Sequence, residues 1–474
     1  MLRHLRIFMC PVLLGHSEKE REKLNHEKLG AGKIISISLM LFAMFFGAGN
    51  MIFPPMLGYL GGENFFQGTL GFVVTDAGLS ILGIAAIVLV GTKLDDLAGL
   101  VGPKFSIFVG MTIYLLIGPL FALPRTGTVS YEIAAIPFLG ENTGIVPSVI
   151  FTALFFGITY ILCLNPSRIV DIVGKVLTPV LLISIAVIFV VSVISPVGEI
   201  GSPKGEYAEM PFFKGMVEGY LALDGLAALA FAIVVINAIR DMGVTKSKSI
   251  VRYTLMAGVL AGIGLGVVYL ALGFVGAQTS MEDTTYGNGG QVLASVVYRL
   301  LGVGGNAVLG LAVMLACLTT SIGLATSFSD YFHEIFPRIS YKAILTGVCV
   351  FSFAISNVGL TTMITFTLPA LVMVYPPAIT LVLLSFAKKI IGKKHEAYAL
   401  AMLFAFIIGI FDGLKTAGID TGALGALAAR LPFFDLGIGW ILPAIAGCII
   451  GMLPFVNFLS KHEAAEKPVP VNIK

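Results

Sequence analysis

The chain has 474 residues, of which 57% are hydrophobic and only 12% are charged, and its formal net charge is +3. A soluble protein of this length carries roughly 25% charged residues, so the composition excludes a large water-facing surface and points to lipid as the solvent. The near-balanced charge gives no indication of nucleic-acid binding. We therefore expect an all-α polytopic membrane protein that is surrounded by the lipid bilayer.

The apolar runs of the sequence predict the membrane crossings. Residues 1–32 form a charged, polar lead in which the apolar run at 7–14 is too short to span a membrane, and we interpret them as a cytoplasmic tail, with 459–474 as a second one. Between the tails, twelve apolar runs have or approach the length of about 20 residues that one crossing takes. They cover residues 34–60, 68–92, 105–137, 146–165, 172–195, 213–240, 251–276, 305–331, 343–357, 361–386, 396–412 and 435–458.

The loops between these runs predict the orientation. An even number of crossings places both termini on one side of the membrane. With the N-terminus inside, the inner loops hold fourteen Lys and Arg residues, and the outer loops and their edges hold five. Positive charge marks cytoplasmic loops, so both termini are expected in the cytoplasm. The longest outer segments are 196–212 and 277–304, and we expect an outer-loop helix near 291–302.

The first run contains a cluster of residues that interrupt helices. Its sequence LFAMFFGAGNMIFPP places GAGN at 47–50 and two prolines at 54–55. Glycine permits unusual backbone angles, Asn is a good N-cap, and proline is tolerated in a first turn. We expect one half-helix to end near Phe46 and a second to begin near Asn50. The unpaired amides suit a carboxylate and the unpaired carbonyls suit a small cation, whereas a plain packing kink is the alternative.

The sixth run, at 213–240, carries Asp224 and Gly225 about a third of the way along. An ionisable residue at this depth marks a functional site by default, and Asp-Gly favours a local break. Two breaks five helices apart predict a 5+5 inverted repeat, because an odd number of helices reverses the second copy. We assign the repeats to 33–195 and 196–386, followed by two extra helices within 387–458.

The third run holds two charged residues on one helical face, Arg125 and, seven residues on, Glu132. They either gate the outer vestibule, directly or through a third group, or Arg125 is structural and bonds carbonyls freed by Pro124. Two further carboxylates, Asp76 and Asp412, are expected to be peripheral.

Sequence motifs for common chemistry are absent. No GxxxxGK[ST], HExxH or GxSxG string occurs, and the six histidines lie in loops or tails. We therefore expect neither an enzyme nor a protein that depends on an ATPase subunit, and no organic cofactor.

Several strings resemble those of the branched-chain amino acid transport system II carriers, in the branched-chain amino acid:cation symporter family. They are GAGNMIFPP (47–55), GPLFALPRTGTVSYE (118–132), NPSRIVDIVGK (165–175), GYLALDGLAALAFAIVVINAIR (219–240), ACLTTSIGL (316–324), ISNVGL (355–360), YPP (375–377) and FDGLK (411–415). The resemblance runs from about residue 33 to 458. It implies a bacterial inner-membrane protein with a leucine-transporter-like fold.

The resemblance also implies a function. Such carriers import leucine, isoleucine and valine with sodium, and alternating access is the mechanism we expect. One alternative is a proton-coupled symporter of the same fold, in which Asp224 or Glu132 titrates. Another is an amino acid sensor that binds its ligand without moving it.

In the fold that the resemblance implies, a sodium ion lies between the break of the first helix and the middle of the eighth. Matching the motifs places its ligands on the carbonyls of Ala43, Phe46 and Ala316 and on the hydroxyls of Thr319 and Thr320. Alternatively, the two threonines bond carbonyls one turn back in their own helix.

The expected substrate site surrounds both breaks. The amides of 48–50 would hold the carboxylate, and unwound carbonyls of the first and the sixth helix, the latter around Leu223 and Asp224, would hold the ammonium. Asp224 alternatively carries the coupling ion or a proton, or only bonds between helices. The expected substrate-binding residues are Gly47, Ala48, Gly49, Asn50, Leu223, Asp224, Gly225, Phe121 and Tyr131, with Phe231 and Met314 as further pocket candidates that ordinary packing also explains.

Overall fold

The computed structural model describes residues 29–140, 143–164, 178–454 and 456. Within these ranges every regular element is a helix. The C-terminal tail expected at 459–474 and nearly all of the N-terminal one lie outside the described residues. The inner loop with Arg168 and Lys175 lies outside them as well.

The first half of the chain forms the helices that run from α2 to α11. They are α2 (Ala31–Phe45), α3 (Ala48–Gly61), η1 (Gly62–Asn64), α4 (Phe65–Val90), α5 (Leu94–Ala98), α6 (Pro103–Leu115), η2 (Leu116–Leu120), α7 (Ala122–Ala134), α8 (Ile136–Leu139), α9 (Ile145–Cys163) and α11 (Thr178–Ile194). The segment η2 is a π-helical turn, and its Gly118 has non-helical backbone angles between α6 and α7. Pro119 follows and cannot donate a backbone hydrogen bond, which accounts for the kink.

The second half contains the remaining elements. They are α12 (Glu206–Glu209), α13 (Pro211–Gly219), η5 (Tyr220–Ala222), α14 (Asp224–Asp241), α15 (Ser247–Ala277), α16 (Gly289–Ile335), α17 (Tyr341–Ser356), α18 (Leu360–Phe386), α19 (Lys388–Ile391), α20 (His395–Thr416), α21 (Gly422–Ala428), η6 (Phe434–Leu436) and α22 (Ile441–Met452). The expected outer-loop segment 291–302 is helical and forms the first part of α16. It ends at Gly302, whose φ of 64° kinks the helix.

Seven helical segments in the described part of the chain are long and apolar enough to cross a membrane, and the bent pair α13–η5 and α14 makes an eighth. Four shorter apolar helices, α2, α11, α17 and α22, fall below that length. Each of the twelve expected runs overlaps one of these helices. The multi-pass, all-helical class is therefore confirmed, while the count of twelve crossings and the inverted repeat stay predictions.

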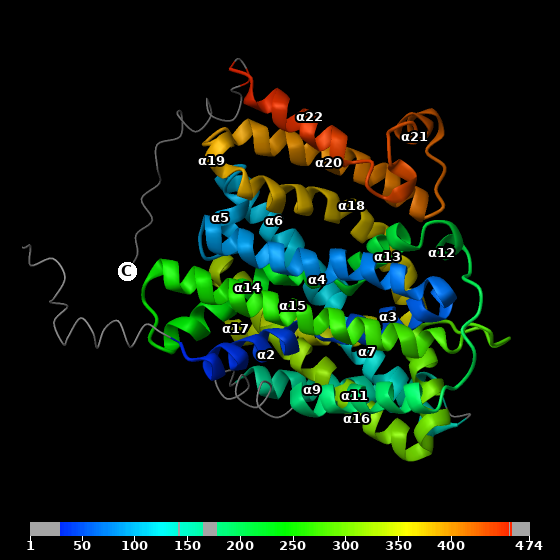
Figure 1. The fold of residues 1–474 in the computed structure, drawn as a ribbon. Coiled ribbons are helices and arrows are strands. Elements are labelled where there is room, and N and C mark those ends of the chain that lie inside the picture. Colours follow the sequence, from blue (N-terminus) through cyan, green and yellow to red (C-terminus); the bar gives the residue numbers. More distant parts are fainter. Residues whose placement is uncertain (1–28, 141–142, 165–177, 455, 457–474) are drawn as a thin grey trace, which may run out of the picture.

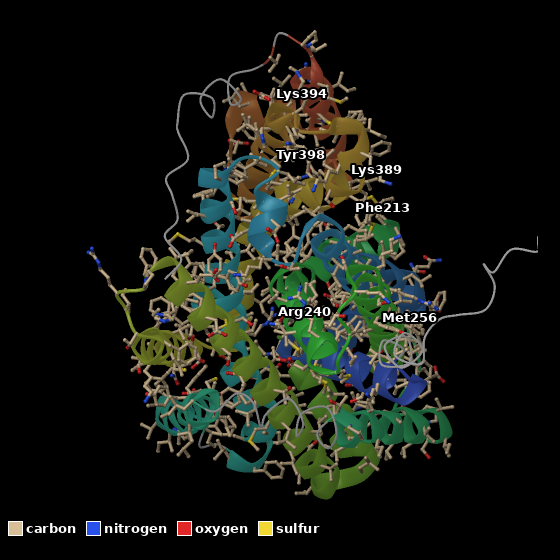
Figure 2. The ribbon with its side chains drawn as sticks, turned by 90° about the vertical axis from the view of Figure 1, so that its left-hand side faces the viewer. Phe213, Arg240, Met256, Lys389, Lys394 and Tyr398 are labelled. Carbon is tan, nitrogen blue, oxygen red and sulfur yellow. The ribbon has the colours of Figure 1, made fainter. Side chains whose placement is uncertain are left out.

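The helices pack side by side in a bundle, with α20 and α22 stacked on α18 at one edge (Figure 1). The centre of the bundle is formed by α3, α4, α14 and α15, which contact one another. At one end lie α5, α19 and the connection from α14 to α15, and Figure 2 views this end, where Arg240, Lys389 and Lys394 are labelled. Large apolar side chains are exposed along the outer helices, as lipid contact requires, for example Leu154 of α9 at 64% and Ile183 of α11 at 63%.

Candidate functional site

The first membrane-crossing segment is interrupted at Phe46 and Gly47. The half-helix α2 ends at Phe45 and α3 begins at Ala48, and Gly47 between them is extended, with φ −123° and ψ −151°. The Gly47 amide donates to Asn50 Oδ1 at 2.9 Å, which caps the start of α3. A Cβ atom on Gly47 would lie 2.6 Å from Thr320 Oγ1, so only glycine lets this link approach α16. The expected break is therefore present, at the expected residues.

The sixth crossing is interrupted at Leu223. This residue has φ 74° and ψ 1°, a left-handed conformation that is rare for a leucine, and η5 and α14 meet there at an angle of 46°. The break lies one residue before the expected Asp224 and Gly225, both of which are already helical. A Cβ atom on Gly49 would be 2.9 Å from Ala222 Cα, so the two breaks lie against each other.

Arg125 of α7 braces the second break. Its Nη1 donates to the carbonyl of Leu221, and its Nη2 donates to the carbonyl of Ala222 at 2.9 Å. The guanidinium also lies over the ring of Phe53, 5.4 Å from its centre. Arg125 thus donates to backbone carbonyls, which agrees with the structural role that the sequence left open. These carbonyls belong to η5, however, and not to the turn that precedes Pro124 in its own helix.

Glu132, two turns further along the same face of α7, has different partners. It accepts from Asn288 Nδ2 and Gln291 Nε2, both at 3.0 Å, at the start of α16. Among the described residues no ion pair joins it to Arg125. A gate made by direct contact between Arg125 and Glu132 is thus not formed in this conformation.

A buried polar cluster connects the two breaks. Asn50 Nδ2 donates to Asp224 Oδ2 at 2.6 Å and also to the hydroxyl of Tyr269 in α15, and that hydroxyl donates to Asp76 Oδ2 in α4. All four side chains are at least 95% buried. The expectation that Asp76 is peripheral was wrong, because α4 packs between α14 and α15 and turns this carboxylate into the core. Its charge in the middle of a 26-residue apolar helix was the signal that could have found it. Tyr269 had no such signal.

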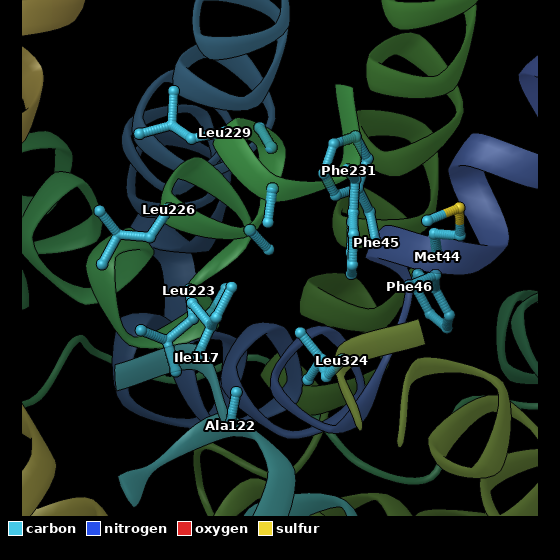
Figure 3. Packing of buried hydrophobic residues seen from close by; sticks show 14 of the residues in the cluster. Met44, Phe45, Phe46, Ile117, Ala122, Leu223, Leu226, Leu229, Phe231 and Leu324 are labelled. Carbon is cyan, nitrogen blue, oxygen red and sulfur yellow. The ribbon is translucent and has the colours of Figure 1, made fainter. Parts of the chain in front are cut away.

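A small cavity of about 20 Å³, lined by buried residues, lies where the breaks meet. This is enough space for about one water molecule. Backbone and polar atoms of both breaks line it together with an apolar wall, in which Phe45 and Phe231 lie side by side with ring centres 5.9 Å apart (Figure 3). Its lining residues are Met44, Phe45, Gly47, Ala48, Gly49, Asn50, Ala122, Arg125, Thr126, Ala222, Leu223, Asp224, Ala227, Phe231, Thr320 and Leu324.

Four expected pocket residues lie elsewhere. Phe121, Tyr131, Gly225 and Met314 are not among the cavity's lining residues. Tyr131 instead packs on Phe151, with ring centres 5.7 Å apart. A fifth candidate, Phe231, does line the cavity.

Two of the expected sodium ligands, Ala43 of α2 and Thr319 of α16, lie near each other across the two helices. Thr319 Oγ1 donates to the carbonyl of Ala316 at 2.8 Å and lies 3.5 Å from that of Ala43. The hydroxyl of Thr320 is buried without a hydrogen-bond partner. A hydrogen bond to a carbonyl one turn back in the same helix thus accounts for the hydroxyl of Thr319. It does not account for the hydroxyl of Thr320. Phe46 is the first residue after α2. Sodium binding by the carbonyl and hydroxyl oxygens of these residues stays a prediction.

A second cavity, of about 320 Å³, begins at Met44 and Thr319 and extends toward the end of the bundle at which α5 lies. Met44 lines both cavities. At the far end Lys93 Nζ pairs with Glu334 Oε1 at 2.6 Å. Asp95 lies beside this pair, and burial raises the pKa of its carboxyl. The sequence did not reveal this cavity, because its lining comes from segments far apart in the chain.

These features define a class of protein, a multi-pass membrane protein whose bundle is interrupted by two touching helix breaks. Solved structures share this fold. Mhp1, a nucleobase-cation-symport-1 family transporter in a closed conformation, aligns with a TM-score of 0.60 at 15% identity, covering 93% of this chain and 97% of that chain. MhsT in complex with L-phenylalanine aligns with a TM-score of 0.51 at 16% identity, covering 88% and 97%. The fold is leucine-transporter-like, as expected.

The chain belongs to the family of branched-chain amino acid transport proteins, whose sequence profile matches residues 31–457. Branched-chain amino acid permease BrnQ of Bacillus subtilis is 46% identical over 429 residues, covering 90% of this chain and 98% of the relative. The branched-chain amino acid transport system 2 carrier protein of Pseudomonas aeruginosa is 39% identical, covering 89% and 95%. BrnQ of Escherichia coli is 34% identical, covering 90% and 96%. These relatives are named as permeases and carriers, which are not enzymes.

Proposed function

We propose that the protein imports leucine, isoleucine and valine across a bacterial inner membrane by sodium-coupled symport. The observation that carries this proposal is the junction of the two breaks. It combines unpaired backbone groups, an apolar wall and candidate cation ligands within one buried site. The names of the relatives, which are branched-chain amino acid permeases and carriers, support the choice of cargo.

The groups at the junction match the parts of an apolar amino acid. The first amides of α3, at 48–50, have no partner within their own helix and suit a carboxylate. The last carbonyls of α2 suit an ammonium or a cation. The carbonyls of Leu221, Ala222 and Leu223 already accept bonds, the first two from Arg125 and the third from the Ala227 amide. Of the two sets of carbonyls expected to hold the ammonium, those at the end of α2 are therefore the better candidates, and those at the break of the sixth crossing are already used.

The buried charges favour a monovalent cation as the coupling partner. Asp76, Asp224 and Arg125 sum to a formal charge of −1 in the core, and a zwitterionic amino acid adds none. One bound cation brings the sum to zero, which lowers the cost of burial. Sodium at Ala43, Phe46, Ala316, Thr319 and Thr320 fits this requirement, and the unpartnered hydroxyl of Thr320 is explained as a ligand. A proton shared within the Asp76–Asp224 cluster is the second candidate, and that cluster favours Asp224 over Glu132 as the titrating group.

The two cavities support transport by alternating access. In this conformation the junction leaves only about 20 Å³, while the larger cavity leads from Met44 toward the Lys93 end. With both termini cytoplasmic, that end faces inward, and cargo and ion leave through it when the broken helices tilt. Each positive charge that enters gains about 2.3 kcal/mol from a potential of 100 mV.

Uptake of labelled leucine into proteoliposomes tests the proposal. A sodium gradient without a pH gradient is expected to drive uptake, and a pH gradient without sodium is expected to give none. Uptake driven only by the pH gradient would show that the coupling ion is a proton and not sodium. Absence of both uptake and leucine counterflow, in protein that still binds leucine, would instead identify a sensor.

A further inference from the structure

The guanidinium of Arg125 is buried at the junction without a counter-ion in contact. Its side chain is 4% exposed. No described carboxylate lies within 4.0 Å of it as an ion pair. A buried charge is normally paired, because removing it from water is costly. Two of its nitrogens donate to η5 carbonyls, but the Nε–H has no partner.

We infer that Arg125 binds the carboxylate of the transported amino acid directly, through this free Nε–H, next to the amides of α3. The inference rests on the proposed function and assigns a substrate contact to a residue that was expected only to gate or to brace. Arg125 lines the cavity of about 20 Å³ at the junction, and a Cβ atom on Gly49 would lie 2.8 Å from its Nη2. The guanidinium therefore sits against the N-terminus of α3.

Two positive features meet in this space, and Asp224, which also lines the cavity, makes no ion-pair contact with the guanidinium. The N-terminus of a helix carries a partial positive charge, and it adjoins a full positive charge on Arg125. The nearby carboxylates have other partners, since Asp224 Oδ2 accepts from Asn50 and Asp76 Oδ2 accepts from Tyr269. An incoming carboxylate satisfies the Nε–H and the free amides at once, and the planar guanidinium matches its geometry.

The brace and the substrate contact use different atoms. Nη1 and Nη2 hold Leu221 and Ala222, which fixes the guanidinium in place, while Nε remains available. A purely structural arginine gives no discrimination between a carboxylate and a neutral group on the ligand, whereas a contact through Nε does.

The test compares leucine with leucinamide, in which a carboxamide replaces the carboxylate. Each ligand is titrated against uptake of labelled leucine in the parent, Arg125→Lys, Arg125→Gln and the control Arg299→Gln. Arg299, in the first part of α16, pairs with Glu282 and does not line the cavity. We expect the parent and the control to prefer leucine by a hundredfold or more. In Arg125→Gln this preference should shrink at least tenfold, and Arg125→Lys should retain an intermediate preference.

Equal losses of affinity for both ligands in Arg125→Gln would overturn the inference and leave Arg125 as a brace. If Arg125→Gln does not reach the membrane, the comparison is made with Arg125→Lys. A ratio of leucine to leucinamide affinity that is unchanged from the parent in this variant would overturn the inference. Failure of the proposed function looks different, because the parent itself then takes up no leucine.

Discussion

Asn50 and Asp224 are 174 residues apart in the chain, and the Nδ2 of the first donates to the Oδ2 of the second at 2.6 Å. Asn50 opens the second half of the first crossing, and Asp224 opens the second half of the sixth. The bond therefore joins the two broken helices at their breaks. Because the bond is buried, its loss would cost free energy with no compensating bond to water, so the breaks are expected to move together.

Replacing Asp76 with asparagine should weaken sodium binding. The variant keeps an oxygen that can accept from Tyr269, but it raises the formal charge of the core from −1 to zero. We expect the sodium concentration for half-maximal leucine uptake to rise at least tenfold, which corresponds to about 1.4 kcal/mol. Asp412→Asn, at the far end of α20, is the matched control and should leave the titration unchanged. Coincident sodium titrations for Asp76→Asn and the parent would contradict the charge argument.

A methyl group on Gly47 should displace the link between the half-helices. Its Cβ atom would lie 2.6 Å from Thr320 Oγ1 and 3.0 Å from Thr320 Cγ2, which is closer than real contacts allow. Gly47→Ala is therefore expected to reduce leucine uptake more than tenfold at equal protein in the membrane. Gly157→Ala in α9 is the control, because nothing lies within 4 Å of that Cβ position. Parent-like uptake by Gly47→Ala would show that the link does not need its close approach to α16.

Shortening Leu324 should widen the apolar pocket and change the preferred cargo. Leu324 of α16 lines the cavity of about 20 Å³ at the junction, and truncation to alanine removes three carbon atoms from the cavity wall. We expect Leu324→Ala to improve competition by phenylalanine relative to valine by about tenfold, since one methylene in such a pocket changes discrimination by roughly 10- to 200-fold. Leu309→Ala in the same helix is buried but does not line the cavity, and should destabilise without this shift. An identical shift in both variants would mean that loosened packing, and not pocket size, sets the preference.

Breaking the Lys93–Glu334 pair should open the larger cavity more often. Both side chains are about half exposed, at 46% and 63%, so the pair contributes only about 0.2–1 kcal/mol. In Glu334→Gln we expect a thiol reagent to label an added Ser327→Cys, which lines this cavity, roughly twice to five times faster. The charge swap Lys93→Glu with Glu334→Lys should restore the parent rate. Labelling that is equally fast in all three backgrounds would show that the Lys93–Glu334 pair does not control access to the larger cavity.

The local signals in the sequence were sufficient for the first break but not for the second. At 47–50 glycine and asparagine act on their own backbone, so the interruption could be placed without knowing its neighbours. At Leu223 a leucine adopts a left-handed conformation, which no local preference predicts and which the brace from Arg125 helps to hold. The break was therefore expected one residue too late.

The rest of the site depends on which helices become neighbours. Asp76 reaches Tyr269 only because α4 packs against α15, and Phe121 and Tyr131 of the third crossing miss the cavity that Ala122 and Arg125 reach. Side chains one residue apart on a helix point in directions about 100° apart, so small errors in rotation decide which of them line a pocket. Family resemblance located the segments, but it did not identify this cluster.

Amino acid and cation should bind together at the break of the first helix, and equilibrium binding measures this linkage without transport. Affinity for labelled leucine is measured at increasing sodium in purified parent, in Thr320→Val, and in the control Thr367→Val, whose hydroxyl bonds within its own helix α18. Because coupling is reciprocal, sodium should raise leucine affinity at least tenfold in the parent and the control but not in Thr320→Val. Leucine affinity that is independent of sodium in the parent, or full sodium dependence in Thr320→Val, would contradict it.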